Sequence, residues 1–136
     1  MNTYVTWEQA KWLKEKEFDE PCDSIFKEDG EFQSYKNVGD IRTHFKNNEP
    51  INPKTWHRWD TSAPEQWQVI EWLRINHGIW VECNIINYGQ FYCLIWKTPT
   101  KDGNKIKEVS YPNQGEFNSP QEAYSGAFDY ILKELI

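Results

Sequence analysis

Residues 62–97, SAPEQWQVIEWLRINHGIWVECNIINYGQFYCLIWK, decide the fold because this one stretch contains a helix start, a helix stop and two strands. Ser62 and Glu65 have the spacing of a capping box, in which two side chains accept hydrogen bonds from unpaired backbone N–H groups at a helix start. Gly78 supplies the left-handed conformation that commonly closes a helix. At that glycine the hydrophobic period changes from about 3.6 residues to 2. We therefore predict a helix between Ser62 and Gly78 and a strand directly after it.

The predicted helix and strands each have one apolar face. In the strand after Gly78 the odd-numbered residues are apolar, and a turn at residues 87–90 leads to FYCLIWK, whose aromatic and β-branched residues suit a second strand. The two strands are predicted to pair as an antiparallel hairpin. The residues of the helix that recur at helical spacing are Gln66, Val69, Ile70 and Leu73, with Trp67 and Trp72 widening the stripe on either side.

The amino-terminal part is predicted to be a helix followed by a β-ribbon. Thr6 and Gln9 again have capping-box spacing, and the helix that they start is expected to run to about Lys16, with Phe18 beneath its end. Pro21 prevents continuation. Residues 24–26 and 31–35 flank a turn that contains Asp-Gly, which is a strong hairpin signal.

The carboxyl-terminal part adds a strand and a helix. Residues 105–111 have strand composition, and Ser119-Pro120-Gln121-Glu122 predicts a third capped helix. The element order is then α-ββ-α-βββ-α, a single α+β domain with an antiparallel sheet covered by helices. Within the 136 residues we distinguish a helix plus ribbon (1–35), an irregular connection (36–60), and a helix, three-stranded sheet and helix (61–136).

The irregular connection ends in a cluster that could bind a partner, Trp56-His57-Arg58-Trp59. Loops longer than about 12–15 residues without their own secondary structure are often functional. Trp56, Arg58 and Trp59 are of the types that stack on bases or anchor protein interfaces. The alternative is that both indoles pack over the sheet and hold the connection in place.

Charge is distributed unevenly along the chain. The net charge is −6, yet residues 1–31 contain nine Asp or Glu against four Lys, whereas residues 36–60 contain three acids against five Lys or Arg. An acidic chain lacks the cations that bind a phosphate backbone, but it can occupy a basic groove of another protein. We name Glu15, Asp19, Glu20 and Asp23 as the candidate acidic contact face. The alternative is that these acids only keep the domain in solution.

Catalytic, metal and cofactor motifs are absent from the sequence. His44, His57 and His77 fit no metal spacing, and there is no nucleophile elbow or phosphate-binding glycine loop. Cys22, Cys83 and Cys93 lack Cys-x-x-Cys spacing, and we expect free thiols rather than disulfides. We therefore predict a non-enzymatic protein without a metal or cofactor.

Location and nucleic-acid binding can also be predicted. No run of 18 apolar residues and no signal peptide are present, which indicates a cytoplasmic protein without a membrane segment. The second half has the element order of a double-stranded RNA-binding domain. However, the start of its last helix, where such domains place lysines, contains Glu122 and no base, so direct duplex binding is disfavoured.

The run from Thr6 to Cys22, the aromatic ribbon, the Ser62–Gly78 segment and the closing Ser-Pro-Gln-Glu-Ala helix resemble a family of small uncharacterised proteins of phages and mobile elements in Bacteroidota. The resemblance spans most of the chain and is weakest over residues 36–60. It carries no catalytic residues. Small acidic phage proteins are often anti-defence factors, including anti-CRISPR proteins, and the resemblance implies such a role by analogy.

Three hypotheses for function follow. The first is a phage-derived inhibitor that binds a host protein, a CRISPR effector nuclease with a basic channel, through the acidic face and the aromatic loop. The second is an accessory protein that contacts nucleic acid through Trp56, Arg58 and Trp59, and the third is a housekeeping interaction module. Monomer and homodimer both remain open, because a second copy or the amino-terminal segment could cover the outer face of the hairpin, to which we assign Trp80, Ile86, Phe91 and Ile95.

Overall fold

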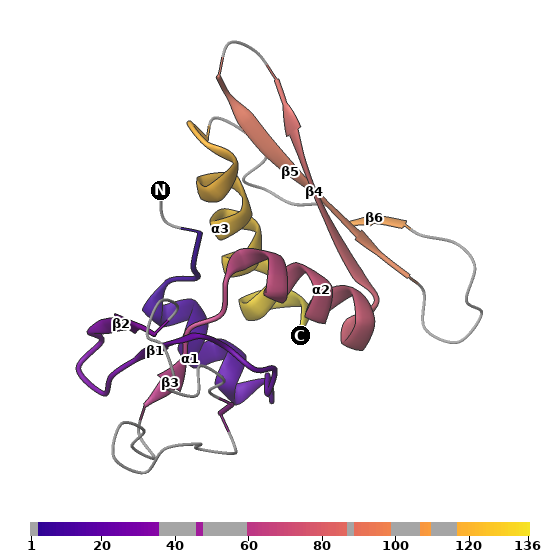
Figure 1. The fold of residues 1–136 in the computed structure, drawn as a ribbon. Helices are drawn as coiled ribbons and strands as arrows, with labels where there is room; N and C mark the ends of the chain where they lie inside the picture. Colours follow the sequence, from indigo (N-terminus) through magenta and orange to yellow (C-terminus); the bar gives the residue numbers. More distant parts are fainter. Residues whose placement is uncertain (1–2, 36–45, 48–59, 87–88, 99–106, 110–116) are drawn as a thin grey trace. The chain divides into compact units, whose positions relative to one another are not determined.

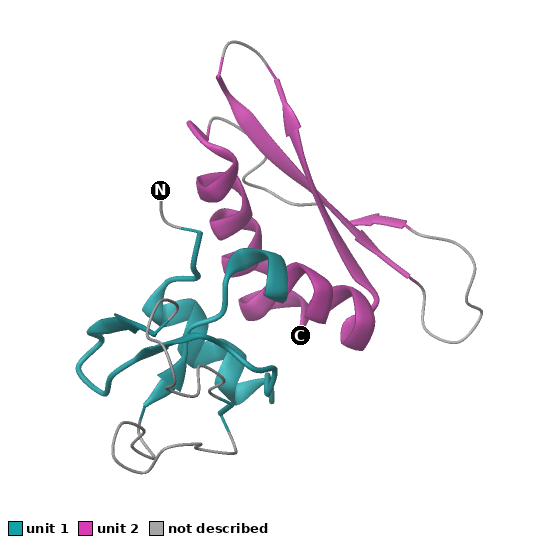
Figure 2. Ribbon diagram, viewed as in Figure 1, with its two compact units in different colours: residues 1, 3–68 teal, residues 2, 69–136 magenta. Residues whose placement is uncertain are grey.

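The computed structural model describes residues 3–35, 46–47, 60–86, 89–98, 107–109 and 117–136. Within these ranges the chain is a mixed α+β domain with three α-helices and two three-stranded antiparallel sheets (Figure 1). The predicted α+β class is thus confirmed. Two compact units are distinguished in Figure 2: unit 1 covers residues 3–68 and unit 2 covers residues 69–136, so the division falls inside the second helix. That the chain divides near residues 36 and 61, as expected from the sequence, stays a prediction.

Unit 1 begins with α1 (Trp7–Glu15), whose first turn has the predicted capping box. The Thr6 hydroxyl accepts a hydrogen bond from the Gln9 N–H at 3.1 Å, and the Gln9 side chain accepts one from the Thr6 N–H at 3.0 Å. Gln9, Ala10 and Leu13 are buried. The capping glutamine is therefore part of the core, and the predicted start of this helix is confirmed.

The end of α1 is a Schellman motif, in which two N–H groups beyond the helix bond back to its last carbonyls. Glu17 N–H donates to the Lys14 carbonyl at 3.1 Å, and Phe18 N–H donates to the Leu13 carbonyl at 2.9 Å. Phe18 and Leu13 occupy the two positions where this motif favours apolar side chains, and both are buried, as predicted for Phe18. Glu17 occupies the position where glycine is favoured, and its φ is +67°.

The first sheet contains one strand that the sequence did not predict. Its order is β2-β1-β3, with β1 (Ser24–Phe26), β2 (Phe32–Ser34) and β3 (Thr61–Ser62) all antiparallel. The β1–β2 hairpin closes through Lys27 N–H, which donates to the Glu31 carbonyl at 2.8 Å, and Gly30 has a φ of +90°. The Asp-Gly hairpin prediction is confirmed.

The predicted helix start at Ser62 is wrong, because Ser62 is part of β3. Its N–H donates to the Asn47 side chain at 2.9 Å, and the next N–H, that of Ala63, donates to the Ser24 carbonyl at 2.9 Å. The helix α2 (Gln66–His77) begins directly after Glu65, whose N–H donates to the Gln68 side chain at 3.0 Å. Strand pairing with β1 therefore places Ser62 in the sheet, whereas the local spacing predicts that Ser62 caps the helix.

One face of α2 is buried, as expected, with a correction at Trp67. Val69, Trp72 and Leu73 are buried, but the Trp67 side chain is 60% exposed and does not widen the core stripe. Its indole N–H instead donates to the Glu65 carboxylate at 2.8 Å. The helix ends at Gly78, whose φ of +61° confirms the predicted left-handed stop.

Unit 2 contains the predicted hairpin and its third strand. β4 (Ile79–Ile85) pairs with β5 (Phe91–Lys97), which pairs with β6 (Lys107–Val109), in the order β4-β5-β6. Cys83 lies opposite Cys93, and Trp80 lies opposite Trp96. Directly opposite residues share a face of the sheet, so this register assigns every strand residue to one side.

The last helix covers one face of this sheet. α3 (Pro120–Tyr130) continues into a π-helical turn (Ile131–Leu135), and it contacts β4 and β5 (Figure 1). The predicted cap is confirmed, because the Ser119 hydroxyl accepts from the Glu122 N–H at 3.1 Å. The buried side chains of this helical segment, with those of the facing strands, form the core of unit 2: Ala123, Ala127, Phe128, Ile131, Leu132, Ile79, Cys93 and Ile95.

Replacing Glu17 with glycine is expected to stabilise the protein. A left-handed backbone costs a non-glycine residue about 1 kcal/mol, and a carboxylate near a helix carboxyl end is unfavourable to the helix dipole. We expect Glu17→Gly to raise the free energy of unfolding in urea by about 0.5–1.5 kcal/mol. Glu17→Gln is the control that removes only the charge. If the two variants are equally stable, the backbone conformation contributes nothing to the gain.

Candidate partner-binding surfaces

The four predicted acidic residues follow one another along the end of α1 and the segment to β1, but they differ in exposure. Glu15, the last residue of α1, and Glu20 are exposed, whereas Asp19 is half-buried. Asp23 is also half-buried, and its carboxylate accepts hydrogen bonds from the Tyr4 hydroxyl at 3.1 Å and the Ser24 hydroxyl at 2.8 Å. Asp23 thus holds the amino-terminal segment against β1, and Glu15 and Glu20 are the residues most open to a partner.

The lysines of the same unit are partly occupied by internal contacts. The Lys11 ammonium lies 2.9 Å from the Glu8 carboxylate and 4.1 Å from the centre of the Trp7 ring. The Lys14 ammonium donates to the Asp60 backbone carbonyl at 3.0 Å. Burial lowers the pKa of Lys14, and the nearby Asp60 carboxylate opposes that shift. Lys11 and Lys14 are thus engaged within the unit, and residues 1–31 contain nine Asp or Glu against four Lys.

Trp56, Arg58 and Trp59 lie outside the described residues. The prediction that they bind a partner or nucleic acid therefore stays a prediction.

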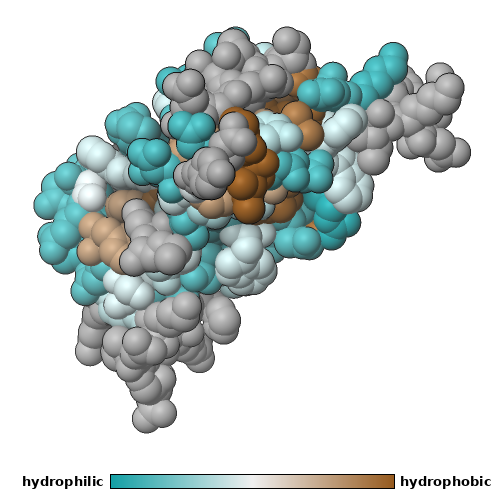
Figure 3. Space-filling view, turned by 90° about the horizontal axis from the view of Figure 1, so that it is seen from above, coloured by the Kyte–Doolittle hydropathy of each residue, from teal (hydrophilic) through white to brown (hydrophobic). Residues whose placement is uncertain are grey.

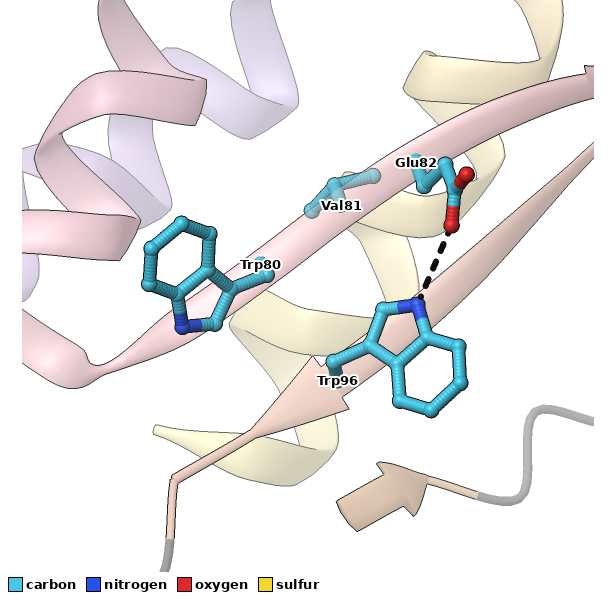
Figure 4. Close-up of a pocket in the computed structure, with 4 residues that line it drawn as sticks. All are labelled: Trp80, Val81, Glu82 and Trp96. Atoms are coloured by element: carbon cyan, nitrogen blue, oxygen red, sulfur yellow. Dashed lines mark hydrogen bonds between the residues drawn. The ribbon is translucent and has the colours of Figure 1, made fainter. Parts of the chain in front are cut away.

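A second surface, which the sequence did not single out, lies on the face of the β4–β5–β6 sheet opposite α3. Trp80 and Trp96 project from neighbouring strands to the same side, with Glu82 beside them (Figure 4). They line an open hollow of about 390 Å³ together with Val81, which lies between Trp80 and Glu82 in β4 although the register assigns its side chain to the α3 face. We call these four residues the two-tryptophan hollow. The Trp80 side chain is 38% exposed.

Each indole of the hollow has a charged side chain beside it. The Trp96 indole N–H donates to the Glu82 carboxylate at 3.3 Å, the bond drawn in Figure 4. The guanidinium of Arg74, on α2, lies 5.6 Å from the centre of the Trp80 ring and 2.8 Å from the Glu71 carboxylate. The hollow therefore combines aromatic walls with a carboxylate at its edge.

The alternating pattern of the sequence assigned Trp80 to the correct face of the sheet but did not pair it with Trp96. Alternation had placed Trp80 on the face opposite the odd-numbered residues, but Phe91 and Ile95 had been assigned to the same outer face as Trp80. This assignment is wrong, because Ile95 lies opposite Val81 and is buried, whereas Trp80 lies opposite Trp96. Phe91, four residues before Ile95 in the same strand, shares the face of Ile95. The register across the turn was needed to pair the two indoles.

Exposed apolar side chains occur at several other positions. On the face seen in Figure 3, dark brown surface forms small areas among hydrophilic atoms. Scattered apolar residues are normal for a protein surface. The large exposed apolar residues among those described are Phe32, Trp67, Ile75, Trp80, Ile85 and Ile86.

The cysteines are free thiols in protected environments. Burial raises the pKa of Cys22 to about 12, and the neighbouring Ser62 hydroxyl opposes that shift. Burial also raises the pKa of Cys93 and, with an opposing contribution from the Cys93 thiol, that of Cys83. Thiolates are the reactive form of cysteine, so these environments do not favour nucleophilic chemistry.

The described ranges contain neither a cluster of metal-ligating side chains nor a helix suited to span a membrane. No group of three or more His, Cys, Asp or Glu in them is arranged to hold a metal ion. None of the helices formed by the described residues has the length and apolar character needed to cross a membrane.

Comparison of the chain with family models, with curated proteins and with solved structures found no significant match. The resemblance to small phage proteins therefore stays a prediction.

The thiols are expected to differ in reactivity. At pH 8 in the folded protein, Cys83, which is half-buried, should react first with iodoacetamide. Cys22 and Cys93 should react at least ~100-fold more slowly than they do in urea, because little thiolate forms at buried positions. Mass spectrometry of labelled peptides measures each rate. Labelling of Cys22 as fast as Cys83 in the folded protein would contradict the burial described above.

Cys22 should also make stability depend on alkaline pH. The folded pKa, about 12, exceeds the ordinary value of 9.0, so above pH 9 the unfolded chain loses its proton first. The contribution of this thiol to stability is thus complete below pH 9 and is lost as pH rises towards 12. We expect the free energy of unfolding to fall more steeply over this range in the wild type than in Cys22→Ala. Parallel slopes would contradict the shift.

Proposed function

We propose that this chain is a phage-derived, non-enzymatic inhibitor that binds a basic surface of a host defence protein, with an RNA-guided CRISPR nuclease as the target class. The observation that carries the proposal is the set of exposed carboxylates at the end of α1, represented by Glu15 and Glu20. The phage origin and the target class come from the family resemblance and its analogy to anti-CRISPR proteins. The cytoplasm of the bacterial host is the compartment in which such a target is found.

The proposed mechanism is competition for a nucleic-acid channel. A channel that holds a heteroduplex is lined with Lys and Arg, which bind the phosphate backbone. Exposed carboxylates can pair with the same cations, and complementary fields accelerate the encounter of the two proteins. Because exposed charges are screened within about 10 Å at 0.1 M salt, the association rate should fall as salt rises. The inhibitor would thus exclude nucleic acid without any covalent step.

The placement of the acidic residues shows which substitutions test this mechanism. Reversing Asp23 would break its bonds to Tyr4 and Ser24, and a loss of activity would then report misfolding as well as lost charge. Glu15 and Glu20 avoid that ambiguity because both are exposed. Glu28 and Glu31, at the β1–β2 turn, are also exposed and provide a matched pair elsewhere in unit 1.

We expect Glu15→Lys with Glu20→Lys to weaken inhibition at least about tenfold, because it replaces attraction to a basic channel with repulsion. The control, Glu28→Lys with Glu31→Lys, changes the net charge by the same amount and should retain most of the activity. DNA cleavage by Bacteroidota RNA-guided nucleases, at two salt concentrations, is the measurement. Equal activity of both double variants would remove the acidic face from the mechanism, and failure to bind any such nuclease at low salt would reject the target class.

A further inference from the structure

The two-tryptophan hollow has a ligand chemistry of its own, separate from the acidic face of unit 1. Its two indoles lie directly opposite each other on β4 and β5, and Glu82 is bonded to Trp96. The helix α3 contacts the other face of these strands, the one that carries Cys93 and Ile95. The hollow is therefore a partly built site that offers flat aromatic surface and a carboxylate.

The charges around the hollow favour a cation. The register places Glu108 of β6 directly opposite Trp96, so Trp96 has a carboxylate on both sides along the sheet. Among the described strand residues of this face, the charged ones are Glu82 and Glu108. Lys97 and Lys107 are opposite each other in the strand register and belong to the other face. An anionic ligand would be repelled. A purely apolar ligand would remove water from the Glu82 carboxylate and leave its charge without a cation, because the Trp96 indole N–H is a neutral donor.

A guanidinium fits this combination better than an ammonium does. It is planar, stacks on aromatic rings, and donates paired hydrogen bonds to a carboxylate. The structure contains one such contact already, because the Arg74 guanidinium lies over Trp80 while pairing with Glu71. The remaining indole, Trp96, and its carboxylate, Glu82, offer an equivalent pair to a guanidinium from outside.

We propose that the two-tryptophan hollow binds an arginine side chain of a partner protein, with the guanidinium stacked on Trp96 and paired with the Glu82 carboxylate. This inference does not rest on the acidic face of unit 1 or on the identity of the proposed target. It assigns to unit 2 a short-range contact that recognises one side chain.

The direct test uses short peptides and the indole N–H signals of the whole protein. A peptide with one arginine between glycines and serines is compared with the same peptide carrying citrulline, which has nearly the same shape without the charge. Titration followed by NMR is expected to shift the Trp80 and Trp96 indole signals, assigned with Trp80→Phe and Trp96→Phe. The citrulline peptide should bind at least about fivefold more weakly. Equal shifts with both peptides, or none with either, would overturn the proposal.

The residue test compares two matched carboxylates. Glu82→Gln removes the charge at the hollow but keeps the side-chain shape, and it should weaken the arginine peptide at least about fivefold. Glu65→Gln is the control, because Glu65 also accepts from an exposed indole, that of Trp67, at 2.8 Å. It should leave binding unchanged. Equal effects of the two variants would overturn the proposal, and if Glu82→Gln fails to fold, the comparison of the two peptides on the wild type decides.

Discussion

The register of the β4–β5 hairpin is the constraint on which the rest of unit 2 depends. Thr98 N–H donates to the Gly78 carbonyl at 2.9 Å, and Ile86 N–H donates to the Gln90 carbonyl at 2.9 Å. These two bonds fix the pairing at both ends of the strands. A slip of one residue would exchange the two faces of a strand. The same pairing therefore directs Ile79 and Ile95 to α3 and Trp80 and Trp96 away from it.

The register also explains the environment of the two strand cysteines. Hydrogen-bonded pairs alternate with non-hydrogen-bonded pairs along an antiparallel ladder. Counting from the bonds at Gly78 and Ile86, Cys83 and Cys93 form a non-hydrogen-bonded pair, in which side chains lie closest. Tyr124 of α3 lies near both sulfur atoms, and burial raises its pKa. Packing by α3 thus keeps these thiols protonated, and their closeness is a consequence of core formation.

Local signals predicted most elements of the fold, and long-range pairing limited the rest. The capping box at Thr6 and the cap at Ser119 depend on residues three positions away and were recognised correctly, although the Glu122 carboxylate accepts from the Asn118 N–H and so does not complete a box with Ser119. Ser62 has the same spacing, but Ser24 and Asn47, far away in the sequence, bond to the backbone around it. No local rule contains those partners. The candidate sites follow the same division, because the acidic segment could be read from composition, whereas the hollow required the partner strand of Trp80.

The two candidate surfaces would contribute to binding through different physics. Exposed carboxylates act over a Debye length, and their main effect is on the rate of encounter and its salt dependence. An arginine between an indole and a carboxylate acts only in contact, where partial desolvation strengthens the interaction and slows dissociation. Charge at Glu15 and Glu20 could be moved to neighbouring positions with little loss, because a field does not require exact placement. The hollow has no such tolerance, because shifting Trp96 by one residue would turn its indole towards α3 and leave Glu82 without its donor.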